Sequence, residues 1–177
     1  MFIEHGANVS LDKIAEAART TKVTLYGHFP SKEVLINAAL TQPFTSAEVF
    51  DGAILDPADP AGSLLQVAIA YVDLATSESI VAQILTLYQA AGKDHALAKA
   101  VYDSGPAAMI ELLAAYLGTV TALRIEQPAF AAEQFLSLVR GMEQTRSLLS
   151  LPAARRGRAR KSYLESCVTL FLRGYSA

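Results

Sequence analysis

The amino-acid sequence predicts an all-helical protein, built as a small N-terminal unit followed by a larger helical bundle. Apolar residues recur at spacings of three and four along most of the 177 residues, which is the period of helices buried on one side. Residues that begin or end helices, namely Ser, Asp, Pro and Gly, separate these periodic stretches. No stretch alternates apolar and polar residues over the length of a strand, so no β-sheet is expected.

Two short helices joined by a tight turn form the predicted start of the fold. Ser10 is a suitable N-cap for a helix of about two turns, whose apolar positions begin at Leu11. A second short helix is expected over residues 21–28, and Ser31 is placed to cap a third. Two short helices separated in this way are typical of a helix-turn-helix motif.

The third helix and the loop that follows it set the domain boundary. Pro43 is expected to stop or kink this helix, because proline removes a backbone donor and clashes with the preceding turn. Residues 51–62 are rich in Asp, Pro and Gly and predict a loop. We therefore divide the chain into residues 1–45 and residues 46–177.

The larger unit is predicted as a series of amphipathic helices. Gly92 is expected to end one of them, Gly105 and Pro106 to break the chain after another, and Pro128 to open a long one. The expected helices cover residues 64–75, 80–91, 94–102, 107–123, 128–149 and 160–175.

Composition excludes several classes of protein. Hydrophobic residues make up 52% and charged residues 18% of the chain, which excludes a disordered protein and predicts self-association or an apolar pocket. Cys167 is the only cysteine, which excludes a disulfide framework and predicts a buried packing residue. Charged or polar residues interrupt every apolar run before the roughly 18 residues of a membrane span, and the first residues lack a secretory signal pattern. We expect no membrane association and a cytoplasmic location.

Charge is distributed unevenly along the chain. Residues 1–40 are neutral, residues 41–154 carry a net charge of −7, and residues 155–177 carry +5. The chain as a whole therefore lacks the basic character of many nucleic-acid-binding proteins, and DNA binding must depend on local features. The basic run 155–161 predicts a solvated loop, with a secondary contact to DNA or another anionic partner as the alternative.

The N-terminal unit carries the one specific motif. Its residues Ile14-Ala15, Ala18, Thr24-Leu25-Tyr26, His28-Phe29 and Ser31-Lys32-Glu33 occur at the spacing of the DNA-binding segment of TetR-family transcriptional regulators, which this unit resembles. Residues 97–118 and 128–141 resemble, more weakly, the C-terminal ligand and dimer domain of the AcrR/AefR-like branch. The resemblance implies an all-α protein with an N-terminal helix-turn-helix DNA-binding domain and a C-terminal helical bundle for ligand binding and dimerisation.

The second short helix is the candidate DNA reader. Helical spacing places Lys22, Val23, Tyr26 and Gly27 on its outward side, where they are available to a major groove. Lysines supply positive charge for phosphates, and Thr, Tyr and His side chains can donate hydrogen bonds to phosphates or base edges. The predicted DNA-binding residues are Thr21, Lys22, Val23, Thr24, Tyr26, Gly27, His28 and Lys32.

Some of these roles rest on the resemblance, and two have simpler alternatives. The resemblance implies backbone or groove contacts for Thr24, Tyr26 and Lys32, and it places Lys22, Val23 and Gly27 at positions that vary to set sequence choice. Tyr26 also fits a packing aromatic. His28 also fits a helix-end residue that interacts favourably with the helix dipole.

The chain departs from the family pattern at two places. Arg19 occupies the turn position usually taken by glycine, and Thr20 follows at a small apolar position, so we expect a strained or reshaped turn. The family has a further helix before the motif, and only residues 1–5 match its end. The resemblance thus implies that most of this helix is missing, and we expect low DNA affinity.

No chemistry of catalysis or metal binding is predicted. His5, His28 and His95 lack the spacing and the neighbouring carboxylates of a metal site. The sequence contains no nucleophile elbow and no glycine-rich phosphate loop. We therefore expect no catalytic residues, no metal and no cofactor.

The larger unit carries candidate pocket and interface residues. Scattered aromatic and methionine side chains fit either a simple core or an apolar pocket, with Gln134 or Arg140 at its edge. Helices 128–149 and 160–175 are apolar enough to form a four-helix bundle with a second copy. The pocket candidates are Tyr71, Tyr88, Tyr102, Met109, Tyr116, Phe135 and Met142, and the interface candidates are Phe130, Leu138, Leu164, Val168 and Phe171.

These features lead to one functional prediction and two rivals. We expect a homodimeric regulator, a repressor, that binds double-stranded operator DNA and is released by a small hydrophobic or aromatic ligand. The first rival is a helical small-molecule-binding or protein-interaction module that has lost DNA binding, which the neutral N-terminal unit favours. The second is a helical-bundle enzyme, for which no residues stand out.

Overall fold

The structure is a computed structural model that describes residues 10–32, 34–35, 38, 49–50, 53, 55–91 and 95–176. The regular elements of this part of the chain are all helical, which confirms the predicted fold class. Leu123 and Ser176 form one isolated bridge there. In order, the elements are α2 (Leu11–Ala17), α3 (Lys22–His28), α6 (Pro60–Ala75), α7 (Glu78–Ala91), α8 (His95–Tyr102), the π-helical η2 (Asp103–Ala107), α9 (Ala108–Leu117), α10 (Pro128–Arg140), α11 (Glu143–Leu148) and α12 (Gly157–Tyr175).

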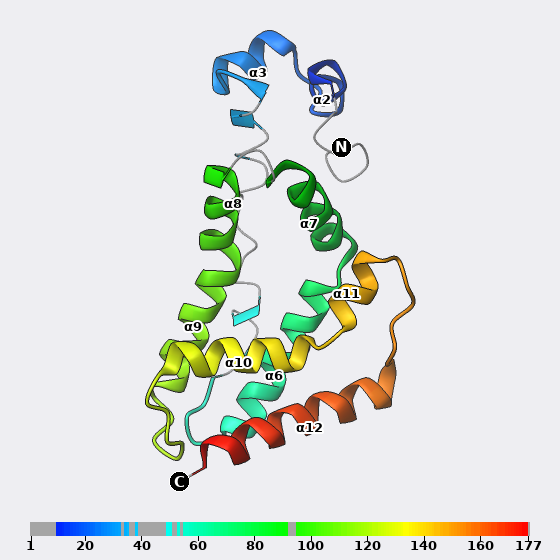
Figure 1. Ribbon diagram of the computed structural model, residues 1–177. Helices are drawn as coiled ribbons and strands as arrows, with labels where there is room; N and C mark the ends of the chain where they lie inside the picture. The colour runs from blue at the N-terminus through cyan, green and yellow to red at the C-terminus, as the bar shows by residue number, and fades with distance from the viewer. Residues whose placement is uncertain are drawn as a thin grey trace.

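The helices form two clusters, each with its own hydrophobic core. Figure 1 shows α2 and α3 at one end of the molecule, α6, α10 and α12 at the other end, and α7 and α8 between them. The smaller core contains Ile14, Ala15, Leu25 and Leu35, whereas Val49 already packs in the larger one. The division into residues 1–45 and 46–177 stays a prediction, because the region around it lies outside the described residues.

Side-chain caps fix the starts of several helices, as the sequence predicts. The hydroxyl of Ser10 accepts a hydrogen bond from the backbone N–H of Lys13 at 3.3 Å, and the hydroxyl of Ser31 accepts one from Val34 at 3.2 Å. Pro128 occupies the first turn of α10, where its missing N–H costs nothing. Local chemistry therefore explains where these helices begin.

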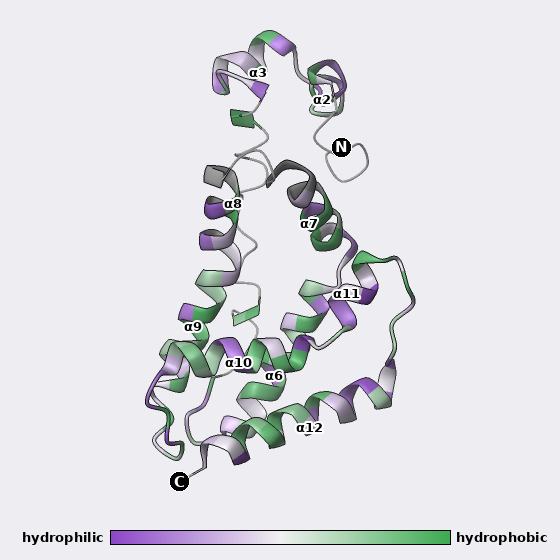
Figure 2. Ribbon diagram, in the orientation of Figure 1, coloured by the Kyte–Doolittle hydropathy of each residue, from purple (hydrophilic) through white to green (hydrophobic). Residues whose placement is uncertain are grey.

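The larger core lies between α6, α9, α10 and α12. Hydrophobic and hydrophilic residues interleave along these helices in Figure 2, so each helix offers one apolar side to its neighbours. Leu64, Leu113, Phe135 and Leu164 are fully buried, one from each helix. The ring of Phe135 meets that of Phe171 edge to face, with their centroids 5.0 Å apart.

The helical path does not break at Gly105 and Pro106, contrary to the sequence prediction. The π-helical η2 contains Pro106 and carries the chain from α8 into α9, so that residues 95–117 run as one column in Figure 1. In an α turn, proline lacks the N–H donor and its ring clashes with the carbonyl four residues earlier. The wider π turn relieves this clash, so the helix continues. This column forms one wall of the cavity described below.

Four other predicted helix boundaries are wrong. The predicted loop 51–62 overlaps the first residues of α6, which begins at Pro60 and not at residue 64, because Asp59 caps the helix and proline fits its first turn. The helix expected over 107–123 ends at Leu117, and the helix expected over 128–149 ends at Arg140, where Gly141 adopts a φ of +50°. The last helix begins at Gly157 and includes most of the basic run predicted as a loop. The expected effects of Pro43 and Gly92 and the end of a preceding helix at residues 1–5 lie outside the described residues.

No single helix of the described ranges is both long and apolar enough to cross a membrane. The helices over Pro60–Ala75 and Glu78–Leu85 pass the same test only as a pair, bent by 57°. Six residues of α6, among them Leu64 and Val72, are buried within the protein.

Candidate functional site

The turn between α2 and α3 is closed by backbone hydrogen bonds. The N–H of Thr20 donates to the carbonyl of Ala15 at 2.9 Å, and the N–H of Arg19 donates to that of Glu16 at 3.0 Å. This pattern is a Schellman motif, in which the residue after the C-cap is left-handed. That residue is Arg19, whose φ is +50°, so the strain expected at this position is present.

Replacing Arg19 with glycine is expected to stabilise the N-terminal unit by about 0.5–1 kcal/mol, because glycine adopts this φ without steric cost. Thermal unfolding of the full chain, compared with Arg19→Ala, measures the effect. The alanine variant keeps a Cβ and should gain nothing. Equal stability of the two variants would show that the arginine side chain, and not the backbone, sets the free energy of this turn.

The outward side of α3 is open and carries apolar side chains. Val23 is 80% exposed and Tyr26 is 52% exposed, and no atom lies within 4 Å of where a Cβ on Gly27 would be. Leu25, on the opposite side, is buried against α2. Exposed apolar residues beside an open backbone are costly in water and typical of a binding surface. Tyr26 therefore does not pack in the core, which removes the simpler alternative for it.

The polar candidates around α3 differ in their surroundings. Thr21 is the N-cap, accepting from the N–H of Thr24 at 3.1 Å, and the two hydroxyls lie 3.0 Å apart. His28 is exposed in the last turn, which leaves both of its interpretations open. Lys32 is half-buried after the Ser31 cap.

Lys22 already has a partner within the chain. Its Nζ lies 2.6 Å from a carboxylate oxygen of Asp12 in α2, and both side chains are largely exposed. An exposed ion pair of this kind contributes little to stability, so a phosphate can compete with Asp12 for Lys22. The sequence analysis did not predict this ion pair. It joins the first turn of α2 to the first residue of α3, two helices that the sequence analysis did predict.

A cavity of about 500 Å³ lies in the larger unit, enclosed by helices from α6 to α11. Such a volume suits a small organic ligand. Four of the predicted pocket residues, Tyr71, Tyr88, Tyr102 and Met109, line it, and so does Arg140. Its wall consists of Tyr71, Leu74, Ala75, Ile80, Gln83, Ile84, Tyr88, Ala98, Val101, Tyr102, Gly105, Pro106, Met109, Ile110, Glu133, Leu136, Ser137, Arg140 and Gln144.

Three other predicted pocket residues do not line this cavity. Phe135 and Tyr116 point into the core instead, and the Tyr116 hydroxyl donates to the carbonyl of Asp56 at 3.0 Å. Met142 is 68% exposed beyond the end of α10. Gln134, a second edge candidate, accepts a hydrogen bond from Tyr175 at 2.6 Å. Aromatic identity alone did not reveal which side of each helix these residues occupy.

The polar residues of the cavity wall were mostly missed. Glu133, Ser137 and Arg140 follow one another at helical spacing along one side of α10, and Gln144 lies in α11 beyond the turn at Gly141. That spacing was the available signal. Burial raises the pKa of the Tyr71 phenol, and the positive charge of the nearby Arg140 partly offsets the rise.

Three predicted interface residues are used inside one protomer. Leu164, Val168 and Phe171 are buried in the larger core, because α12 packs against α6 and α10 of its own chain. They are therefore not available to a second copy. Leu138 is half-buried, whereas Phe130 on α10 is 59% exposed and Leu170 on α12 is 61% exposed. The large apolar side chains that α10 and α12 expose to solvent are these last two.

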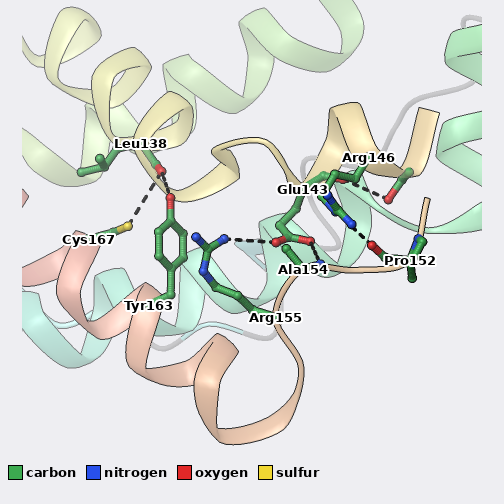
Figure 3. A network of polar contacts seen from close by, with 9 residues as sticks. Leu138, Glu143, Arg146, Pro152, Ala154, Arg155, Tyr163 and Cys167 are labelled. Carbon is green, nitrogen blue, oxygen red and sulfur yellow. Dashed lines mark hydrogen bonds and ion pairs between the residues drawn. The ribbon is translucent and has the colours of Figure 1, made fainter. Parts of the chain in front are cut away.

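A polar network joins the end of α10 to α11 and α12 (Figure 3). The buried carboxylate of Glu143 accepts hydrogen bonds from the N–H of Ala154 and from Arg155, both at 3.2 Å. The guanidinium of Arg155 lies 4.1 Å from the ring centroid of Tyr163, whose hydroxyl donates to the carbonyl of Leu138 at 3.3 Å. This network holds the loop before α12 against the bundle.

Two residues of the basic run tie elements of the bundle together. Arg155 pairs with Glu143, and Arg160 pairs with Asp73 of α6 at 2.7 Å. Arg156 and Arg158 are exposed, and a contact between them and an anionic partner stays a prediction.

Reactive chemistry is not evident in the described part of the chain. No group of three or more His, Cys, Asp or Glu residues there is placed to hold a metal ion. Cys167 is buried, as predicted, and burial raises the pKa of its thiol. The thiol is therefore protonated at neutral pH.

Comparison with known protein families covers both parts of the chain. The family described as bacterial regulatory proteins, tetR family, matches residues 1–39, and the AefR-like transcriptional repressor C-terminal domain matches residues 62–177. No curated protein matches the chain significantly.

Solved structures agree over nearly the whole length. The Flavonoid-responsive Regulator FrrA is 31% identical with a TM-score of 0.79, over 99% of this chain and 91% of that one. A putative TetR-family regulator from Mesorhizobium loti MAFF303099 is 21% identical with a TM-score of 0.85, again over 99% and 91%. A TetR-family regulator from Pseudomonas syringae pv. tomato str. DC3000 is 23% identical with a TM-score of 0.72, over 99% and 90%. The chain belongs to the TetR family of bacterial transcriptional regulators, which are not enzymes, and its C-terminal domain is of the AefR-like type.

Proposed function

We propose that this protein is a repressor that binds operator DNA as a homodimer through the outward side of α3. The observation that carries the proposal is the open surface formed by Val23, Tyr26 and Gly27, with Lys22 at its edge. Side chains on such a surface can reach base edges in a major groove, and the lysines contribute phosphate contacts. Such a regulator would act in the cytoplasm, where its operator lies.

Dimerisation would allow two copies of this surface to contact one duplex. Two recognition helices must stand about 34–36 Å apart, or a multiple of that distance, to read two half-sites on one side of a duplex. Phe130 and Leu170 are the exposed apolar side chains that support an interface formed by α10 and α12. The Leu170→Lys variant tests this interface, because a lysine there would place a charge between the two copies. We expect sedimentation velocity to show a shift of this variant from dimer toward monomer.

The cavity supports release of DNA by a small hydrophobic or aromatic molecule. Tyr71, Tyr88 and Tyr102 give its wall aromatic surface with polar tips. FrrA is named as flavonoid-responsive, which favours an aromatic ligand class for this chain as well. A ligand that binds better to a dimer with the wrong helix separation shifts the population away from DNA, and the coupling is reciprocal.

DNA binding is tested by fluorescence anisotropy on duplex from the flank of the protein's own gene, across a salt series. Lys32→Ala is expected to weaken binding about tenfold for all sequences and to reduce the salt slope by about one, because one phosphate would no longer be neutralised. Lys22→Ala should in addition relax base preference. Unchanged affinity of Lys32→Ala at low salt would show that its assigned phosphate contact is wrong.

Asp12→Asn provides the matched variant for the same measurement. It removes the carboxylate that competes with phosphate for Lys22 and is expected to raise DNA affinity several-fold at low salt, since one negative charge also leaves the surface.

Ligand binding without specific DNA binding by the wild type at low salt would favour a small-molecule-binding module. The zero net charge of residues 1–40 is the observation that supports this second candidate.

A further inference from the structure

Polar side chains of different charge follow one another along the part of the cavity wall formed by α10. Glu133, Ser137 and Arg140 are at positions i, i+4 and i+7, so they share one side of the helix. A rise of 1.5 Å per residue separates Glu133 from Arg140 by about 10 Å along the helix axis. The cavity therefore has an acidic group at one end of this row, a hydroxyl in the middle and a basic group at the other end.

Arg140 differs from Arg155 and Arg160, the two arginines that tie elements of this bundle together through ion pairs. Arg140 is half-buried in the cavity wall, and within the described residues no carboxylate lies within ion-pair distance of it. A guanidinium in a mostly apolar wall attracts an anionic group more strongly than one on an open surface does, because water screens its charge less.

The remaining residues of the cavity wall favour a ligand with an aromatic ring. Tyr71 lies near Arg140, and Tyr88 and Tyr102 are largely exposed, which places them at the mouth of the cavity. Ile84, Met109 and other aliphatic side chains fill the remaining wall. Flat rings gain both burial and edge or face contacts among such side chains.

We infer that the cavity takes an aromatic acid whose carboxylate contacts Arg140 and whose far end carries a hydroxyl that donates to Glu133. The inference rests on the proposed function of the cavity as the ligand site, and it adds the ligand's chemical class and its orientation. The guanidinium provides paired N–H donors that match a carboxylate. Glu133 accepts hydrogen bonds and repels an anion, so it excludes the reverse orientation.

The test uses three probes and isothermal titration calorimetry of the full chain. The probes are 4-hydroxycinnamate, its uncharged methyl ester, and cinnamate, which lacks the ring hydroxyl. Wild-type protein is expected to bind 4-hydroxycinnamate at least about tenfold more tightly than the ester, the usual strength of a charged hydrogen bond. It should also bind 4-hydroxycinnamate more tightly than cinnamate.

Variants assign these preferences to residues. Arg140→Met is expected to lower the affinity for 4-hydroxycinnamate by about 10–100-fold and to leave that for the ester within about twofold. Arg140→Lys keeps the charge without the planar donor pair and should retain part of the preference for the acid. Glu133→Gln should weaken binding of 4-hydroxycinnamate and leave cinnamate unchanged. Thermal unfolding of each variant verifies folding, and Arg140→Lys keeps the test informative if Arg140→Met does not fold.

The outcomes separate this inference from the proposed function. Equal affinity for the acid and the ester, an equal loss of both in Arg140→Met, or no binding of the acids overturns the inference. If the neutral flavonoid naringenin binds and releases DNA while the acids do not bind, the inference fails and the proposed function stands. If the acids bind with the expected pattern but do not release DNA, the ligand class is supported and ligand-controlled release fails.

Discussion

Replacing Phe135 with alanine is expected to lower the free energy of unfolding by about 3–5 kcal/mol. The side chain is fully buried between α6, α9 and α12, and its ring packs edge to face on Phe171. Truncation removes the buried area and leaves a cavity that the close-packed helices cannot fill. Urea unfolding at a fixed protein concentration measures the loss, because oligomerisation makes apparent stability depend on concentration.

Phe135→Leu is the matched control for this change. Leucine keeps most of the buried volume and should cost no more than about 1.5 kcal/mol. A loss below about 1 kcal/mol in Phe135→Ala would contradict the position of the ring in the core. It would instead favour the pocket role that the sequence predicted for Phe135.

Gly141→Ala is expected to lower the free energy of unfolding by about 2–3 kcal/mol. Gly141 ends α10 with φ +50° and ψ −133°, a conformation accessible to glycine and costly for other residues. A Cβ there would also lie 2.7 Å from the hydroxyl of Tyr163, which is held by Leu138. The substitution is therefore opposed by both backbone strain and a steric clash. Denaturant unfolding, again at fixed concentration, measures it.

Two further variants separate the strain from the clash. Gly157 has the same φ of +50°, but a Cβ there meets no atom within 4 Å, so Gly157→Ala should cost only about 1 kcal/mol. Adding Tyr163→Phe to Gly141→Ala removes the clashing oxygen and should recover part of the loss. Equal effects of the two glycine substitutions would show that Tyr163 moves aside freely.

Local sequence signals predicted the helix-turn-helix and the caps Ser10 and Ser31 well. Ser10 and Ser31 cap helices through their own hydroxyls, and such contacts depend only on residues three positions away. Thr21, which is expected inside the second helix, is its N-cap instead. The exposed side of α3 also follows from local spacing, once Leu25 is known to face α2. Strain at Arg19 was expected because the family that this unit resembles usually has glycine there, and the structure places Arg19 in the left-handed region.

Helix ends and the cavity were predicted less well. The π-helical passage through Pro106 has no local signal, because proline ordinarily breaks a helix. The end of α10 at Gly141 did have one, since glycine commonly follows the last residue of a helix, but the prediction continued the helix through it. Aromatic residues such as Tyr71 and Phe135 look alike in the sequence, yet one lines the cavity and the other fills the core. Their roles depend on which helix lies opposite.

The sequence by itself determined the helical class, the caps and the family, because each depends on short-range spacing or on a motif within some 30 residues. Tertiary structure decided which apolar sides pair inside one chain and which remain exposed. Leu164, Val168 and Phe171 became core because α6 and α10 cover them, whereas Leu170 stayed outside. Tertiary structure also decided that Arg140 lines a cavity, where no ion pair of the described residues includes it. An amphipathic pattern specifies that a side is buried, and only packing in three dimensions specifies its partner.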